Sequence, residues 1–219
     1  MTKHRLLHCL LTVCATLLLV LACRNTAEPE TSSPTAAPSV PYWSEILYKK
    51  AAFVQGWKFI VIHHSATNTG NAKSFDEYHR SRGFGGLAYH FVIGNGHGSK
   101  DGEIEVGFRW KDQMAGTHVT VNSWYHNIFG IGICLVGDFT THKPTEKQMA
   151  ALTGLVAYLM KQYDIPIENV IGHKDVNFGT ISWNDQALSV KPIPGKFEKD
   201  SCPGAAFPWE RLRVALKGL

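Results

Sequence analysis

Runs of apolar, β-branched residues along the chain predict buried strands, because four to eight such residues bounded by turn residues are typical of strands covered on both faces. Runs of this kind predict strands at 59–65 (FIVIHHS), 87–95, 131–137 and 169–172, with a hairpin return at 103–108 after a glycine-rich turn.

Helical spacing of apolar residues separates these strands. Ser74 to Arg82 predicts a short helix, with Ser74 as N-cap and Glu77 completing a capping box. The longest predicted helix opens at Thr145, and its apolar positions run from Met149 to Tyr163. A closing helix is predicted over 208–216. Strands that alternate with helices, together with a hairpin, predict an α/β fold: a single domain with a mixed central β-sheet flanked by helices.

The first 22 residues have the pattern of an export signal. Lys3 and Arg5 precede an apolar stretch that ends at Ala22 and is too short to span about 30 Å of hydrocarbon comfortably. The closing letters VLAC resemble a bacterial lipobox, which implies lipidation at Cys23. A plain secretory signal and an uncleaved anchor are the alternatives.

Residues 23–41 are rich in Pro, Ser, Thr and Ala and predict a flexible tether, so the folded domain is expected over 42–219. Arg24 after the cysteine favours a membrane-anchored lipoprotein on the periplasmic face of the outer membrane.

Charge and composition argue against a nucleic-acid-binding protein and against a disordered chain. The 22 basic and 18 acidic residues give a net charge of +4, with no basic stripe of the kind that nucleic acid requires. The aromatic content, 11%, is too high for a disordered chain.

Candidate metal ligands stand at the ends of predicted strands. His63 and His64 close the first strand, His173 closes the last one, and Cys202 follows in DSCPG. Two imidazoles and a thiolate form a ligand set for a catalytic zinc that leaves one position to water. Because successive strand side chains point to opposite faces, a regular strand directs only one of the two histidines to the ion. Both faces are apolar, so the pattern leaves that choice open.

Six motifs in order carry a family resemblance: VIHHSAT, LAYHFVIG, AGTH, Asn127 ahead of GIGICLVGDF, IGHKDV and CPG. Together they resemble the zinc N-acetylmuramoyl-L-alanine amidases, which include phage amidases and peptidoglycan recognition proteins. The resemblance covers about 57–209. It implies one zinc held by His63, His173 and Cys202, Tyr89 as an active-site residue, and peptidoglycan or muropeptides as the partner.

The resemblance also implies how the amide between N-acetylmuramic acid and L-alanine is cut. Tyr89 is expected to hydrogen-bond the attacking water or the oxyanion, and Asp200 to accept a proton, with Lys199 as the alternative. His118 is expected to face the substrate. The insertion 177–199 could be a lid, a groove wall or a surface loop.

Three rival interpretations stay open. Some relatives bind peptidoglycan without cleaving it. Cys202 could be a nucleophile with His173 as its base. Cys134, otherwise expected to be a small core residue, could form a disulfide with Cys202.

Overall fold

The computed structural model describes residues 56–120, 123–184, 187–197 and 201–218, of which 179–184 and 187–197 are described by their backbone. The predicted signal peptide, the lipidation at Cys23 and the tether lie outside these residues, as do Lys199 and Asp200. Within the described ranges, no helix combines the length and apolar character that crossing a membrane requires.

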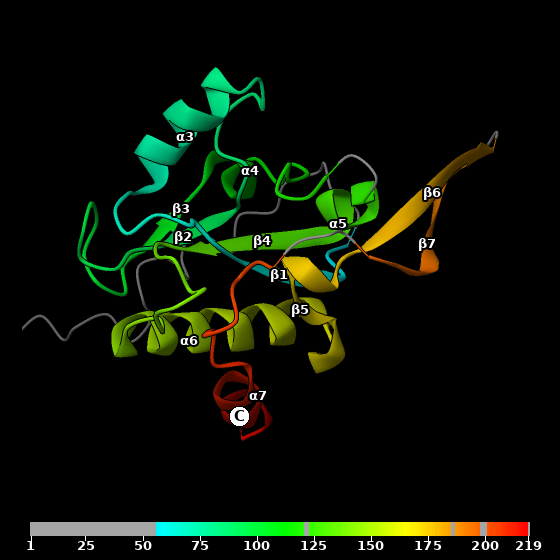
Figure 1. Cartoon of the computed structure of the whole chain (residues 1–219). Helices are drawn as coiled ribbons and strands as arrows, with labels where there is room; N and C mark the ends of the chain where they lie inside the picture. The colour runs from blue at the N-terminus through cyan, green and yellow to red at the C-terminus, as the bar shows by residue number, and fades with distance from the viewer. Residues whose placement is uncertain (1–55, 121–122, 185–186, 198–200, 219) are drawn as a thin grey trace, which may run out of the picture. The chain divides into compact units, whose positions relative to one another are not determined.

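A five-stranded sheet forms the centre of the domain, in the order β3-β2-β4-β1-β5 (Figure 1). Its strands are β1 (Phe59–His64), β2 (Phe91–Ile93), β3 (Ile104–Val106), β4 (Gly130–Leu135) and β5 (Val170–Gly172). Only β3 runs antiparallel to its neighbour, β2, and the other pairs are parallel. The mixed sheet expected from the sequence is therefore confirmed.

Helices cover both faces of the sheet. They are α3 (Ala72–Ser81), α4 (Phe108–Lys111), α5 (Trp124–Phe129), α6 (Glu146–Tyr163) and α7 (Trp209–Lys217), with 3₁₀ turns η2 (Ile167–Asn169) and η3 (His173–Asp175). In Figure 1, α6 lies below the sheet with α7 beneath it, and α3 lies above the sheet.

Strand alternation divides the apolar residues between two layers. Ile60 and Ile62 of β1 are fully buried and pack with α6 residues such as Leu152 in the main core. Val61 points to the opposite face and packs with Val176. His63 follows Val61 on that opposite face, because the period of a strand is two residues.

One of the two predicted helix N-caps is confirmed and the other is wrong. Thr145 caps α6, and its side chain and that of Gln148 form the expected capping box. The predicted cap of α3 was wrong: Asn71 is the N-cap, and Ser74 is the third residue of that helix, completing a capping box with Asn71. Ser and Asn are both good caps, so residue type alone did not choose between them.

The predicted strand at 87–95 is shorter in the structure, where β2 spans only Phe91–Ile93. The backbone before it bonds to side chains instead of to a ladder. The N–H of Leu87 donates to Asp76, its carbonyl accepts from Arg109, and the N–H of Ala88 donates to His79. The short helices α4 and α5 were not predicted, because a stretch of four to six residues shows too little periodicity.

The insertion at 177–199 forms a β-hairpin in its described part. Strand β6 (Asn177–Asn184) pairs antiparallel with β7 (Ala187–Phe197) as a second, two-stranded sheet. Figure 1 shows this hairpin leaving the body of the domain. It joins η3 to the segment that carries Cys202, so it lies in sequence between two of the candidate ligands.

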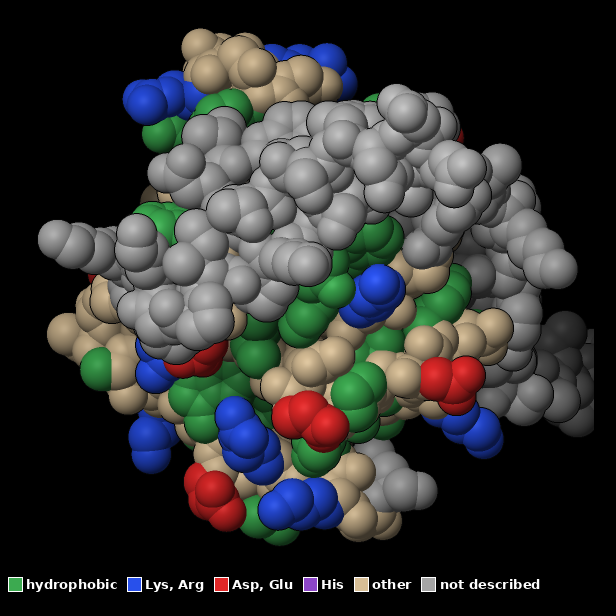
Figure 2. All heavy atoms as spheres, turned by 90° about the vertical axis from the view of Figure 1, so that its right-hand side faces the viewer, with side chains coloured by type: hydrophobic (Ala, Val, Ile, Leu, Met, Phe, Trp, Pro, Cys, Tyr) green, Lys and Arg blue, Asp and Glu red, His purple; other side chains and the backbone are tan. Residues whose placement is uncertain are grey.

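Charged side chains of both signs share one face of the molecule. Figure 2 shows Lys and Arg intermixed with Asp and Glu over the described part of the face that it presents. This distribution agrees with the small net charge of +4.

Candidate metal centre and adjoining cleft

The register of the parallel strands brings His63 and His173 together. Ile62 of β1 pairs with Gly172 of β5, so the residue that follows each of them lies at the same level at the carboxyl ends of neighbouring strands. These residues are His63 and His173, and their ring centroids are 4.8 Å apart. Strand pairing thus joins two imidazoles that are 110 residues apart in sequence.

Backbone hydrogen bonds place Cys202 beside the two histidines. The N–H of Lys174 donates to the carbonyl of Cys202 at 3.0 Å, which ties the segment after the hairpin to η3. The N–H of His64 donates to the sulfur of Cys202 at 3.3 Å. A hydrogen bond from the backbone favours the thiolate, which is the form of cysteine that binds metals.

The three side chains form a set that fits a zinc ion. Their candidate ligand atoms all lie within 4.8 Å of one another, and Cys202 Sγ is 3.8 Å from Nδ1 of His63. Two nitrogens and one sulfur are typical of a catalytic zinc, which takes three protein ligands. Within the described part of the chain, this is the sole such cluster of His, Cys, Asp or Glu found.

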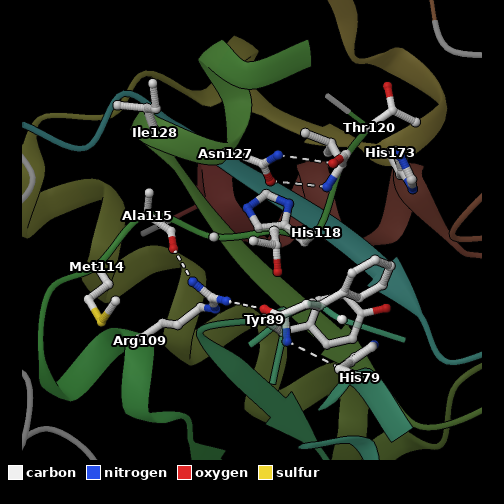
Figure 3. Close-up of a pocket in the computed structure, with 16 residues that line it drawn as sticks. His79, Tyr89, Arg109, Met114, Ala115, His118, Thr120, Asn127, Ile128 and His173 are labelled. Carbon is white, nitrogen blue, oxygen red and sulfur yellow. Dashed lines mark hydrogen bonds between the residues drawn. The ribbon is translucent and has the colours of Figure 1, made fainter. Parts of the chain in front are cut away.

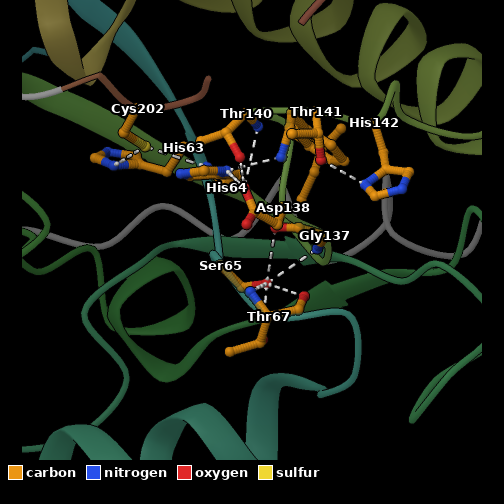
Figure 4. Close-up of polar contacts among 12 residues, drawn as sticks. His63, His64, Ser65, Thr67, Gly137, Asp138, Thr140, Thr141, His142 and Cys202 are labelled. Atoms are coloured by element: carbon orange, nitrogen blue, oxygen red, sulfur yellow. Dashed lines mark hydrogen bonds and ion pairs between the residues drawn. The ribbon is translucent and has the colours of Figure 1, made fainter. Parts of the chain in front are cut away.

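His64 points away from this set, which resolves the choice that the sequence left open. Its Nδ1 accepts a hydrogen bond from the N–H of Phe139 at 3.0 Å and lies 3.7 Å from a carboxylate oxygen of Asp138. Figure 4 shows His63 and Cys202 turned toward each other, while His64 lies against the Asp138 loop.

Burial keeps the imidazole of His63 neutral. His63 is 1% exposed, and desolvation, with repulsion from His173 as a smaller cause, lowers its pKa well below the usual value. A neutral ring presents the lone pair that a metal requires.

Cys134 lies next to this site but outside the ligand set. It pairs in register with His63 on β4, is fully buried, and packs with Val92 and Leu87. Burial raises the pKa of its thiol well above the usual value, so it is held as a thiol. The structure contains no disulfide between Cys134 and Cys202, so that alternative is not supported.

A cleft of about 580 Å³ opens beside the ligand set (Figure 3). His173, Tyr89 and His118 line it together with apolar residues that include Phe84 and Met114. The ring of Tyr89 lies 5.2 Å from that of His63, measured between centroids. The cleft therefore brings a candidate ligand and the predicted active-site tyrosine to one wall.

Two cleft residues hold its walls through backbone contacts. Arg109, on α4, is 7% exposed and donates to the carbonyls of Leu87, Ala115 and Phe84 at 2.7, 2.8 and 2.9 Å. Asn127 pairs with both backbone groups of Val119, as Figure 3 shows. The sequence did not single out Arg109, since a cation in a four-residue helix has no motif to mark it.

His118 contacts a candidate metal ligand as well as the cleft. It lines the cleft, yet it is only 6% exposed, and its Nδ1 lies 3.1 Å from Nε2 of His63. Its other ring nitrogen, Nε2, lies 3.2 Å from the carbonyl of Gly130. Burial is the largest cause that lowers its pKa well below the usual value.

The other histidines of the described ranges divide between the interior and the surface. His79, His90 and His126 are buried, whereas His97 and His142 are exposed. His79 also lines the cleft, and its Nδ1 accepts from the N–H of Ala88. The carboxylate of Asp175 accepts from the N–H of Gly172, which directly precedes His173.

The fold, the cleft and the cluster of His63, His173 and Cys202 suit an amide hydrolase or a binding protein built on the same frame. Residues 54–196 match a family described as N-acetylmuramoyl-L-alanine amidase. The chain belongs to this family, and the resemblance seen in its motifs is confirmed.

Curated relatives include proteins named for peptidoglycan recognition and a phage endolysin. Peptidoglycan-recognition protein SC2 of Drosophila melanogaster is 29% identical over 150 residues, which cover 62% of this chain and 76% of that protein. The endolysin of Klebsiella phage KP32 is 31% identical over 126 residues, covering 53% of this chain and 74% of the endolysin.

Solved structures agree on the fold. The N-acetylmuramoyl-L-alanine amidase LysC from Clostridium intestinale is 28% identical, with a TM-score of 0.57, covering 78% of this chain and 93% of LysC. Peptidoglycan recognition protein-LE, solved in complex with tracheal cytotoxin, is 22% identical with a TM-score of 0.53, and this likeness concerns the fold alone.

Proposed function

We propose that this chain is a zinc-dependent N-acetylmuramoyl-L-alanine amidase, which hydrolyses the amide between N-acetylmuramic acid and L-alanine in peptidoglycan or its fragments. The observation that carries the proposal is the convergence of His63, His173 and Cys202 within 4.8 Å at the wall of a cleft. The family description and the similarity to LysC, at 28% identity, support it.

The donor set suits the demands of the reaction. Zinc, when bound, would supply a Lewis acid that polarises the carbonyl and lowers the pKa of a water to about 7. His63, His173 and Cys202 would hold it, and one thiolate with two neutral imidazoles would leave the centre a net positive charge. Burial of His63 and Cys202, at 1% and 7% exposure, keeps competing solvent away from these ligands.

Other side chains of the cleft would bind and orient the substrate. The apolar side chains of Phe84 and Met114 would pack against the bound chain. Tyr89, whose ring lies beside His63, would hydrogen-bond the attacking water or the developing oxyanion through its phenolic hydroxyl. Asp200, with Lys199 as the alternative, is proposed to move the proton, and both residues lie outside the described part of the chain.

The best test measures zinc and amide cleavage together. Wild-type protein should hold about one equivalent of zinc and release free L-alanine amino termini from muropeptide, with loss on chelation and recovery on adding zinc. In Cys202→Ala we expect the zinc content and the amide cleavage both to fall toward none. For the zinc content, Cys134→Ala is the matched control, because Cys134 is the other described cysteine and lies outside the ligand set.

Two outcomes would favour a rival. A zinc-loaded protein that binds muropeptide but releases no amino terminus would be a recognition module. Inactivation by iodoacetamide that no chelator reproduces would favour Cys202 as a nucleophile with a histidine as its base. His173 is the base expected from the sequence, and His63, whose Nδ1 lies 3.8 Å from Cys202 Sγ, is a second imidazole within reach of the sulfur.

Export and anchoring belong to the same proposal. We propose that residues 1–22 direct export, and that Cys23 carries lipid and holds the domain on the periplasmic face of the outer membrane through the 23–41 tether. Mass spectrometry of the mature N-terminus tests this: a lipid-modified Cys23 is expected, and an unmodified N-terminus or a retained signal would contradict it.

A further inference from the structure

The contacts of His118 define a chain of hydrogen bonds that ends at the metal-facing nitrogen of His63. His118 Nε2 lies 3.2 Å from the carbonyl oxygen of Gly130, and His118 Nδ1 lies 3.1 Å from Nε2 of His63. The remaining nitrogen, Nδ1 of His63, faces Cys202 Sγ at 3.8 Å. All of these imidazole atoms belong to buried side chains.

The chemistry of the partners assigns every proton in this chain. A backbone carbonyl can only accept, so Nε2 of His118 must carry hydrogen and donate to Gly130. In the neutral ring Nδ1 then has a free lone pair, and it accepts from Nε2–H of His63. His63 is left with its lone pair on Nδ1, directed at the ligand set.

We propose that His118 is a positioning residue for the zinc site, which sets the tautomer of His63 so that Nδ1 is the ligand atom. A metal-bound histidine whose other ring nitrogen donates to a fixed acceptor is held in orientation and is a stronger ligand. The inference rests on the proposed zinc site, and it assigns His118 a role besides the substrate contact expected from the sequence.

Two glycines leave the space that the His118 ring occupies. A Cβ added at Gly132 of β4 would lie 2.5 Å from Cδ2 of His118, and a Cβ at Gly116 would also overlap that ring atom. Neither glycine has the positive φ that side chains avoid. Space for the ring, and not backbone conformation, is therefore what requires glycine at both positions.

The neighbouring His90 links the strand that carries Gly132 to the Met114 segment through backbone hydrogen bonds. Its Nδ1 accepts from the N–H of Gly132 at 2.9 Å, and its Nε2 donates to the carbonyl of Met114 at 3.0 Å. Both ring nitrogens of His90 are thus bonded to backbone groups. His118, and not His90, therefore bridges Gly130 and His63.

The experiment is a zinc affinity measurement on the full chain, by competition with a chromophoric chelator. His118→Leu removes the acceptor, and we expect the zinc dissociation constant to rise about 10–100-fold. His118→Asn restores an oxygen near the position of Nδ1 and should recover most of the affinity. Gly132→Ala keeps the histidine but displaces its ring, so it should weaken zinc binding as well.

A matched control separates positioning from general destabilisation. Gln148→Met removes a buried polar group whose amide donates to Ile93 and Val136 on the other side of the sheet. It should lower stability and leave zinc affinity unchanged. Thermal unfolding of each variant, with the metal removed, verifies that the affinities refer to folded protein.

The outcomes distinguish this inference from the proposed function. If wild-type protein binds no zinc, the proposed function fails. If wild-type and His118→Leu bind zinc equally, and only KM for muropeptide rises, His118 is a substrate contact alone and the inference is wrong. Equal losses in His118→Asn and His118→Leu would also overturn it, because the hydrogen bond would then not be the cause.

Discussion

His90 provides a sharp test of how the buried histidines affect stability. It is fully buried, and desolvation lowers its pKa from 6.5 to about 4, opposed in part by its hydrogen bond to the Met114 carbonyl. In the unfolded chain the ring returns to a pKa near 6.5. Between these two values the unfolded state binds a proton that the folded state does not, so the free energy of unfolding falls as the pH falls.

The magnitude follows from the difference between the two pKa values. At ~1.36 kcal/mol for each pKa unit, His90 contributes about 3 kcal/mol to the free energy of unfolding. This contribution is present above pH 6.5 and is lost by pH 4. At pH 5 about 2 kcal/mol of it is lost. His63 and His118 are shifted in the same direction, so the wild-type protein loses more in total.

The assay is urea unfolding of metal-free protein from pH 7.5 to pH 4.5, comparing wild type with His90→Asn. The asparagine oxygen can still accept from Gly132, but it does not titrate. The variant should be less stable near neutral pH, and its deficit relative to wild type should shrink by about 2 kcal/mol at pH 5. His97→Asn, at an exposed histidine, is the control and should follow the wild-type curve.

A deficit of His90→Asn that stays constant across this pH range would refute the reasoning. It would mean that His90 titrates alike in the folded and unfolded chains, and that its burial is relieved by water or by movement of the Met114 segment.

Two further predictions concern the cleft and the sheet. Tyr89→Phe should lower kcat about 10²–10³-fold with zinc content unchanged, as for loss of one oxyanion donor; a loss of zinc instead would make Tyr89 a structural residue. Gln148→Met should lower the free energy of unfolding by about 3 kcal/mol, because the carbonyls of Ile93 and Val136 lose their amide partner. Urea unfolding at neutral pH measures this, and a change under 1 kcal/mol would show that water replaces the amide.

The sequence alone determined the elements that have long or strongly periodic patterns. The capping box at Thr145 and the apolar positions from Met149 onward place α6 correctly, since helix periodicity and capping are local properties. The β-branched runs locate β1 and β4 within one or two residues. Short elements such as α4 and the true cap at Asn71 carry too weak a local signal.

The order of motifs in the sequence also indicated which residues to bring together, but only the tertiary structure decided how they meet. The choice between His63 and His64 depends on which face of β1 packs against α6, and both faces are apolar in sequence. Ile62 pairs with Gly172 of a strand that is distant in sequence, and the sequence of neither strand alone indicates this register. The hydrogen bond from His63 to His118 is set in the same way, because imidazole tautomers follow from the neighbours that folding supplies.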